Sequence, residues 1–123
     1  MPRVAVYFGE DDEFLILPIS KAESGWWREV NKPERLQWDG TSVVALGEKV
    51  LRCWALSPEC VGPPDGATPA FMLATGVKSH RAFARTRQLV FLDTNRDESE
   101  MVVEFLRRDA NFMYSASTDD PKD

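Results

Sequence analysis

The segment 41–57, TSVVALGEKVLRCWALS, constrains the fold most, because it is the one long stretch with helical periodicity. Its apolar side chains recur at helical spacing and share one broad face: Val43, Leu46, Val50 and Trp54, with Val44, Leu51 and Ala55 beside them. A face this broad predicts a helix that lies across a sheet, and Pro58 predicts its end. Gly47 at mid-helix costs about 1 kcal/mol relative to alanine, and its place on this face predicts close approach by a strand backbone.

Short apolar runs on both sides of this helix predict strands. They are 3–8, 14–19, 26–30 and 35–39 before the helix, and 88–93, 100–106 and 111–115 after it. Pro18 cannot donate to a ladder, so the run 14–19 is predicted to be an edge strand, open to a weak homodimer, or to end there. The connections between successive strands are too short for parallel crossovers, which predicts a mainly antiparallel sheet and the α+β class.

A second, short helix is predicted over 79–87, SHRAFARTR, with Ser79 as its N-cap and Phe83 as its apolar anchor. The proline-rich stretch 58–69 predicts an irregular loop before it. The apolar segment 69–74, PAFMLA, fits either a strand or a short helix.

The chain has 123 residues, enough for one domain with its own core. We expect a single α+β domain over 1–116 and a flexible acidic tail over 117–123. No signal-peptide pattern is evident, and no apolar run approaches the roughly 20 residues of a membrane span, so a cytoplasmic protein is expected. Cys53 and Cys60 are expected to be reduced thiols, while a disulfide across the helix end stays open.

The residue types that catalysis needs are sparse. His80 is the single histidine, and the side chain of its neighbour Ser79 diverges from it on a helix, so no triad can be argued. No glycine motif that cradles phosphate is present, and Cys53 and Cys60 make a poor metal site. We therefore expect no enzyme, no metal and no cofactor. A small enzyme stays open only if folding brings carboxylates with perturbed pKa values into a pocket.

The charge balance is 20 acidic against 15 basic residues, which gives a net charge of −5. This argues against a general nucleic-acid binder and permits a basic protein partner. The candidate contact residues are acidic side chains in two loops and two adjacent tryptophans: Glu10, Asp11, Asp12, Glu13, Asp93, Asp97, Glu98, Glu100, Trp26 and Trp27. If the two hairpins share one edge of the sheet, their loops form one acidic patch; otherwise they are ordinary polar turns. The adjacent tryptophans are expected to face opposite sides of a strand, with one near the surface.

The basic segment 78–87 carries the alternative function. Lys78, Arg81, Arg85 and Arg87 could bind nucleic acid, or they could form a solvated helix face.

The order of these pieces resembles the immunity proteins of bacterial contact-dependent growth inhibition systems. The strand pair RVAVYFGEDDEFLILPI, a G-W-W segment, the LGEKVLRCWALS helix and GVKSHRAF leading into QLVFLD and EMVVEFL carry the resemblance. It is supported by Leu46-Gly47 with Val50 and Ser57, and by Gly76-Val77-Lys78-Ser79 with Phe83. The resemblance implies a cytoplasmic inhibitor that blocks the C-terminal toxin domain of a growth-inhibition effector. Some immunity proteins of these systems are similar in fold to whirly-type sheets with helices, and the resemblance implies such a fold here. Such toxins are commonly nucleases. It transfers no catalytic or contact residue to this chain.

Overall fold

The computed structural model describes residues 2–94, 97–108 and 114–116, with the backbone alone for 107–108 and 114–116. The predicted tail 117–123 and residues 111–113 of the last predicted strand lie outside the described residues. The strands are β1 (Arg3–Gly9), β2 (Glu13–Lys21), β3 (Trp27–Glu29), β4 (Glu34–Gln37), β5 (Arg87–Thr94), β6 (Met101–Arg108) and β7 (Tyr114–Ala116). The helices are α1 (Val43–Leu56), α2 (Ala70–Thr75) and α3 (His80–Ala84).

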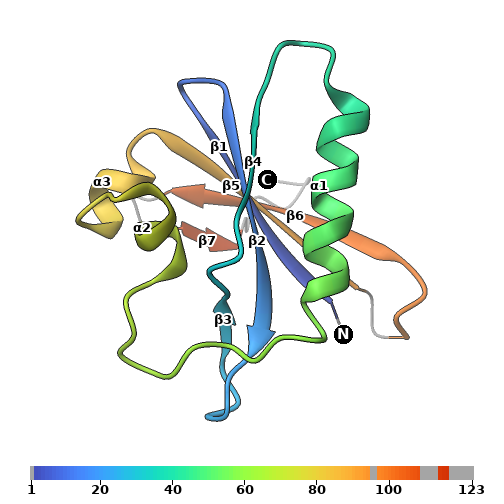
Figure 1. Ribbon diagram of the computed structural model, residues 1–123, viewed down its shortest axis with the longest axis vertical. Coiled ribbons are helices and arrows are strands. Elements are labelled where there is room, and N and C mark those ends of the chain that lie inside the picture. The colour runs from blue at the N-terminus through green and yellow to red at the C-terminus, as the bar shows by residue number, and fades with distance from the viewer. Residues whose placement is uncertain (1, 95–96, 109–113, 117–123) are drawn as a thin grey trace, which may run out of the picture.

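All strand pairs are antiparallel and form one seven-stranded sheet in the order β3-β2-β1-β5-β6-β7, with β4 also paired to β2. Helix α1 lies on one face of this sheet, and α2 and α3 lie on the other (Figure 1). The predicted α+β class with a mainly antiparallel sheet is therefore confirmed. Among the described residues, no helix is long and apolar enough to cross a membrane.

Alternation along the strands supplies a separate core on each face. The α1 face buries Val4, Val6, Ile16 and Leu92 against Cys53 of the helix. The opposite face, here called the α2–α3 face, buries Ala5, Tyr7, Leu15, Leu17 and Leu89 against Phe71 and Phe83. The predicted anchor Phe83 is fully buried, and Ser79 caps its helix by accepting a hydrogen bond from the Ala82 N–H at 3.1 Å. The ambiguous segment 69–74 is helical and ends at Gly76, which has a φ of 75°.

Strand β2 is an interior strand, so the prediction that it would be an edge strand or end at Pro18 was wrong. On one side it pairs with β1, and on the other it pairs first with β4 and then with β3. Pro18 lies between these two partners, where its missing N–H breaks no ladder, and its carbonyl accepts a hydrogen bond from the Val30 N–H at 2.8 Å. A dimer through a free edge at Pro18 loses its basis.

The close strand approach predicted at Gly47 was also wrong. Helix α1 directs Leu46, Val50, Cys53 and Trp54 at the sheet, while Gly47 is exposed and a Cβ placed there would meet no atom of the described residues within 4 Å. A close approach exists instead at Gly62, where a Cβ would lie 2.6 Å from the Ser20 carbonyl oxygen.

Candidate interaction surface

The two acidic loops lie at opposite ends of the sheet. Gly9, at the end of β1, pairs with Arg87 at the start of β5, and both strands run antiparallel from that point. The β1–β2 turn therefore projects from one end, and the connection after Thr94 projects from the other (Figure 1). Because of this register, the two loops do not form one acidic patch.

The β1–β2 turn has the contacts of an ordinary polar turn. The Asp11 carboxylate accepts a hydrogen bond from the Glu13 N–H at 3.1 Å, and Asp12 adopts a φ of 61°. The Glu13 carboxylate lies 3.6 Å from the Arg35 guanidinium, while Glu10 is exposed.

The adjacent tryptophans differ in burial, and Trp26 lies outside β3, so the two do not alternate along one strand. Trp26 lies in the β2–β3 turn with 66% of its surface exposed. Trp27 is half-buried in β3, and the Arg3 guanidinium lies over its ring at 4.4 Å from the centroid.

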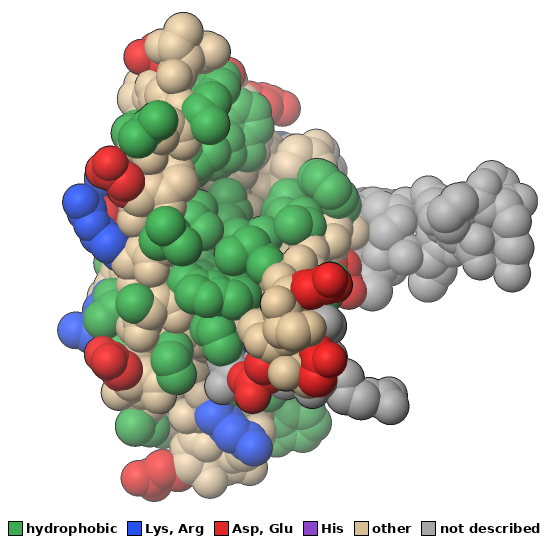
Figure 2. All heavy atoms as spheres, turned by 90° about the vertical axis from the view of Figure 1, so that its right-hand side faces the viewer, with side chains coloured by type: hydrophobic (Ala, Val, Ile, Leu, Met, Phe, Trp, Pro, Cys, Tyr) green, Lys and Arg blue, Asp and Glu red, His purple; other side chains and the backbone are tan. Residues whose placement is uncertain are grey.

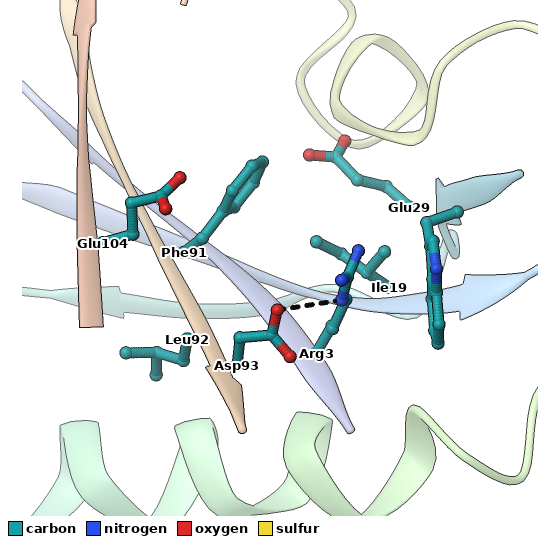
Figure 3. A pocket seen from close by; sticks show the side chains of 8 residues that line it. Arg3, Ile19, Glu29, Phe91, Leu92, Asp93 and Glu104 are labelled. Atoms are coloured by element: carbon teal, nitrogen blue, oxygen red, sulfur yellow. Dashed lines mark ion pairs between the residues drawn. The ribbon is translucent and has the colours of Figure 1, made fainter. Parts of the chain in front are cut away.

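Trp27 and Asp93, two of the predicted contact residues, line one pocket of about 400 Å³ on the α2–α3 face. The Asp93 carboxylate lies 3.1 Å from Arg3 Nε. Figure 3 shows the carboxyl groups of Glu29 and Glu104 facing the hollow from opposite sides, with Phe91 beside Glu104.

Glu29 was missed by sequence reasoning. Its carboxyl group accepts hydrogen bonds from the Tyr7 hydroxyl and the Phe71 N–H, and burial raises its pKa to about 7. A pocket with such a carboxyl is the feature that an enzyme would need. Both donors belong to packed elements, however, and they give this carboxyl a structural role that joins β3 to β1 and α2. No local signal marks Glu29, because the partners come from distant parts of the chain.

The residues that the structure describes hold no group of three or more His, Cys, Asp or Glu side chains that could bind a metal ion. Cys53 and Cys60 are both free thiols, and burial raises the pKa of Cys53 to about 12.

Among the described residues, helix α1 covers only part of its face of the sheet. Helix α1 contacts β1, β2 and β4, and the strands beyond β1 extend past it. Strand β6 directs the side chains of Met101, Val103 and Phe105 to this face. Their exposed fractions are 45% for Met101, 51% for Val103 and 69% for Phe105. Val90 of β5, which pairs with Phe105, is half-buried beside them. We call Val90, Met101, Val103 and Phe105 the apolar strip.

Figure 2 shows apolar side chains running together over this part of the face, from α1 toward the neighbouring strands. An exposed apolar patch that is rimmed by polar residues is a candidate interaction site.

Acidic residues border one end of the apolar strip. Asp97, Glu98 and Glu100 are exposed in the β5–β6 connection. Glu98 and Glu100 line a shallow hollow together with Met101 of the strip and Trp54 of α1. The structure therefore brings three of the predicted acidic contacts to the apolar strip and leaves Glu10–Glu13 at the far end of the sheet.

The basic segment is a less uniform surface than its sequence predicts. Lys78, Arg81 and Arg85 are exposed around α3. Arg87 instead lies over the Phe83 ring at 4.4 Å, and its Nη1 donates to the Phe83 carbonyl at 3.2 Å.

Comparison with known proteins gives a shared fold and no family. No protein-family model matches the chain, and no curated protein matches it. A solved structure described as a protein of unknown function, NMB0488 from Neisseria meningitidis, is similar with a TM-score of 0.66. The match covers 97% of this chain and 80% of that chain at 16% sequence identity. At this identity the likeness shows the fold alone.

Proposed function

We propose that this chain is an immunity protein that binds and neutralises the C-terminal toxin domain, a nuclease, of a contact-dependent growth inhibition effector. The resemblance in the order of its elements supports this function. The observation that carries the proposal is the apolar strip bordered by Asp97, Glu98 and Glu100 on a protein of net charge −5.

The chemistry of this surface suits a basic protein. A nuclease binds phosphates through a cleft lined with cations, so an acidic inhibitor is attracted to it from a distance. The exposed acids would raise the association rate, and burial of Val103 and Phe105 would slow dissociation. Neutralisation is by occlusion, and it requires no catalytic residue, metal or cofactor of the inhibitor. Its place of action is the cytoplasm, where a delivered nuclease finds its substrate.

The deciding experiment is co-purification with the toxin domain encoded immediately upstream of the gene for this chain. We expect a one-to-one complex that abolishes the nuclease activity of the toxin domain. A stable interface of this kind buries about 1,200–2,000 Å² in total. An upstream toxin domain that neither binds nor is inhibited, or an upstream product that is not a toxin, contradicts the proposal.

The alternative is a small nucleic-acid-binding domain, favoured by the exposure of Lys78, Arg81 and Arg85 within one short segment. It predicts affinity for single-stranded RNA or DNA that falls steeply with added salt. Replacing these three cations by glutamate should then abolish the binding. Unchanged affinity in that variant excludes this segment as the binding site.

A further inference from the structure

The apolar strip lies beside one flank of α1, and we call the surface between them the groove, with the strip as its floor and this flank as its wall. On the β4 side of α1, Lys49 and Arg52 lie 3.4 Å and 3.2 Å from the Glu34 carboxylate. Residues on the opposite side of the helix cylinder therefore turn toward β5 and β6. These residues are Val43, Gly47 and Leu51, and all three are exposed.

The two strands that carry the apolar strip, β5 and β6, together have the width of one helix. Neighbouring strands lie about 4.8 Å apart, so two strands span about 10 Å, which matches the diameter of a helix with its side chains. Helix α1 already covers another part of the same face, and Figure 2 shows the apolar surface continuing beside it. A second helix laid beside α1 would complete the layer.

The glycine at position 47 supports a helix in this place independently of the apolar strip. It weakens α1 by about 1 kcal/mol relative to alanine, yet none of the described residues would lie within 4 Å of a Cβ placed there. Its φ requires no glycine, since only Gly25, Gly40, Gly66 and Gly76 have positive φ values among the described glycines. A glycine on the wall of a groove allows the backbone of a neighbouring helix to come close.

We propose that the groove between α1 and β6 receives an amphipathic α-helix of a basic partner, whose backbone comes closest to α1 at Gly47. The apolar side of that helix covers Val103 and Phe105, while lysine or arginine side chains at one of its ends meet Asp97, Glu98 and Glu100. The inference rests on the proposed function, because it assigns the helix to the toxin domain. Docking of an amphipathic helix in an apolar groove is a common mode of recognition.

The first test uses a defined probe. A labelled peptide of leucine and lysine, long enough for about five helical turns, is titrated into the full chain at physiological ionic strength. A peptide of the same composition with a scrambled order is the matched probe. We expect the amphipathic peptide to bind and gain helicity, and the scrambled peptide to bind at least about tenfold more weakly.

Three variants locate the binding. Gly47→Leu fills the wall of the groove and has open space for its side chain, so it should fold normally and bind the peptide about tenfold more weakly. Phe105→Asp removes the floor and should have a similar effect. Leu73→Asp is the matched control, because Leu73 is 55% exposed on α2, which lies on the opposite face. Equal binding by the wild type and Gly47→Leu, or equal loss in Leu73→Asp, overturns the inference.

The toxin domain separates this inference from the proposed function. A toxin complex that is weakened by Phe105→Asp but unchanged by Gly47→Leu supports the proposed function and contradicts the docking of a helix in the groove. Peptide binding that maps to the groove, without any toxin complex, supports the helix site and overturns the function.

Discussion

The hydroxyl group of Tyr7 donates a hydrogen bond to the carboxyl group of Glu29, and this contact joins the interior strand β1 to the short strand β3 across β2. The same carboxyl accepts the Phe71 N–H from the first turn of α2. One side chain therefore holds three elements of the α2–α3 face together, and its protonation state is linked to stability.

The first prediction concerns the pH dependence of unfolding. Burial raises the pKa of Glu29 from 4.5 to about 7, so the folded state holds this proton more tightly than the unfolded state. The contribution is fully present below pH 4.5 and is lost as pH rises through about 7. At about 1.4 kcal/mol per pKa unit, the loss is on the order of 3 kcal/mol.

The check is urea unfolding between pH 4.5 and 8 for the wild type and Glu29→Gln. The amide cannot ionise, so the variant should lose most of this decline with pH. Glu10→Gln, at an exposed position in the β1–β2 turn, is the control and should keep the wild-type profile. Parallel profiles for the wild type and Glu29→Gln would contradict the assignment.

The local sequence pattern was enough to predict the helices and strands, but the strand order and the position of the loops depend on long-range strand pairing. The spacing of Leu46, Val50 and Trp54 was enough to predict α1, and alternation was enough to predict the long strands. Pro18 misled because a missing ladder donor is compatible with an interior strand when the strand changes partners at that residue.

The candidate site was only partly predictable for the same reason. Composition singled out the acidic loops, but the pairing of Gly9 with Arg87 is what sends them to opposite ends of the sheet. The perturbed Glu29 depends on Tyr7 and Phe71, which are far from it in sequence. The apolar strip could be predicted only weakly from the sequence. Strand β6 carries apolar residues on both of its faces, which indicates that both are covered, but the sequence predicts only one long helix to cover a face.

Two glycines predict opposite effects of alanine on the free energy of unfolding. At Gly62 a Cβ would lie 2.6 Å from the Ser20 carbonyl oxygen, so Gly62→Ala should destabilise the protein by about 1–3 kcal/mol. At Gly47 the space is open and the backbone is helical, so Gly47→Ala should stabilise it by up to about 1 kcal/mol. Chemical denaturation of the two variants side by side checks both signs. A destabilising Gly47→Ala would mean that another part of the protein packs closely against α1 at this position.

The two thiols should differ in reactivity. Burial raises the pKa of Cys53 to about 12, and the thiolate is the reactive form, so Cys53 should be protected in the native state. Cys60 is only half-buried and should react. Labelling with a thiol reagent, followed by peptide mapping, should find Cys60 modified in the native protein and both residues modified in denaturant. Native labelling of Cys53 at the rate of Cys60 would contradict the packing of α1 on the sheet.

Phe105 should be a principal anchor of the toxin complex. It is the most exposed side chain of the apolar strip, and an aspartate there would place a charge at the centre of the interface. We expect Phe105→Asp to weaken the complex by at least about 2 kcal/mol, mainly through faster dissociation. Leu73→Asp should leave the dissociation rate unchanged, because it alters a similar exposed apolar residue on the other face. Surface plasmon resonance with the toxin domain measures both rates, and equal losses in the two variants would place the interface elsewhere.

Charge reversal should distinguish the two acidic loops. Glu98 and Glu100 line the hollow that adjoins the apolar strip, whereas Asp11 and Asp12 lie at the far end of the sheet. If the strip is the interface, Glu98→Lys with Glu100→Lys should slow association with a basic toxin domain by about tenfold at low salt. Asp11→Lys with Asp12→Lys changes the net charge equally and should have a smaller effect, because its charges lie at the other end of the sheet and so farther from the contact. Stopped-flow association across a salt series is the measurement. A larger effect from the Asp11 and Asp12 pair would move the interface to the β1–β2 turn.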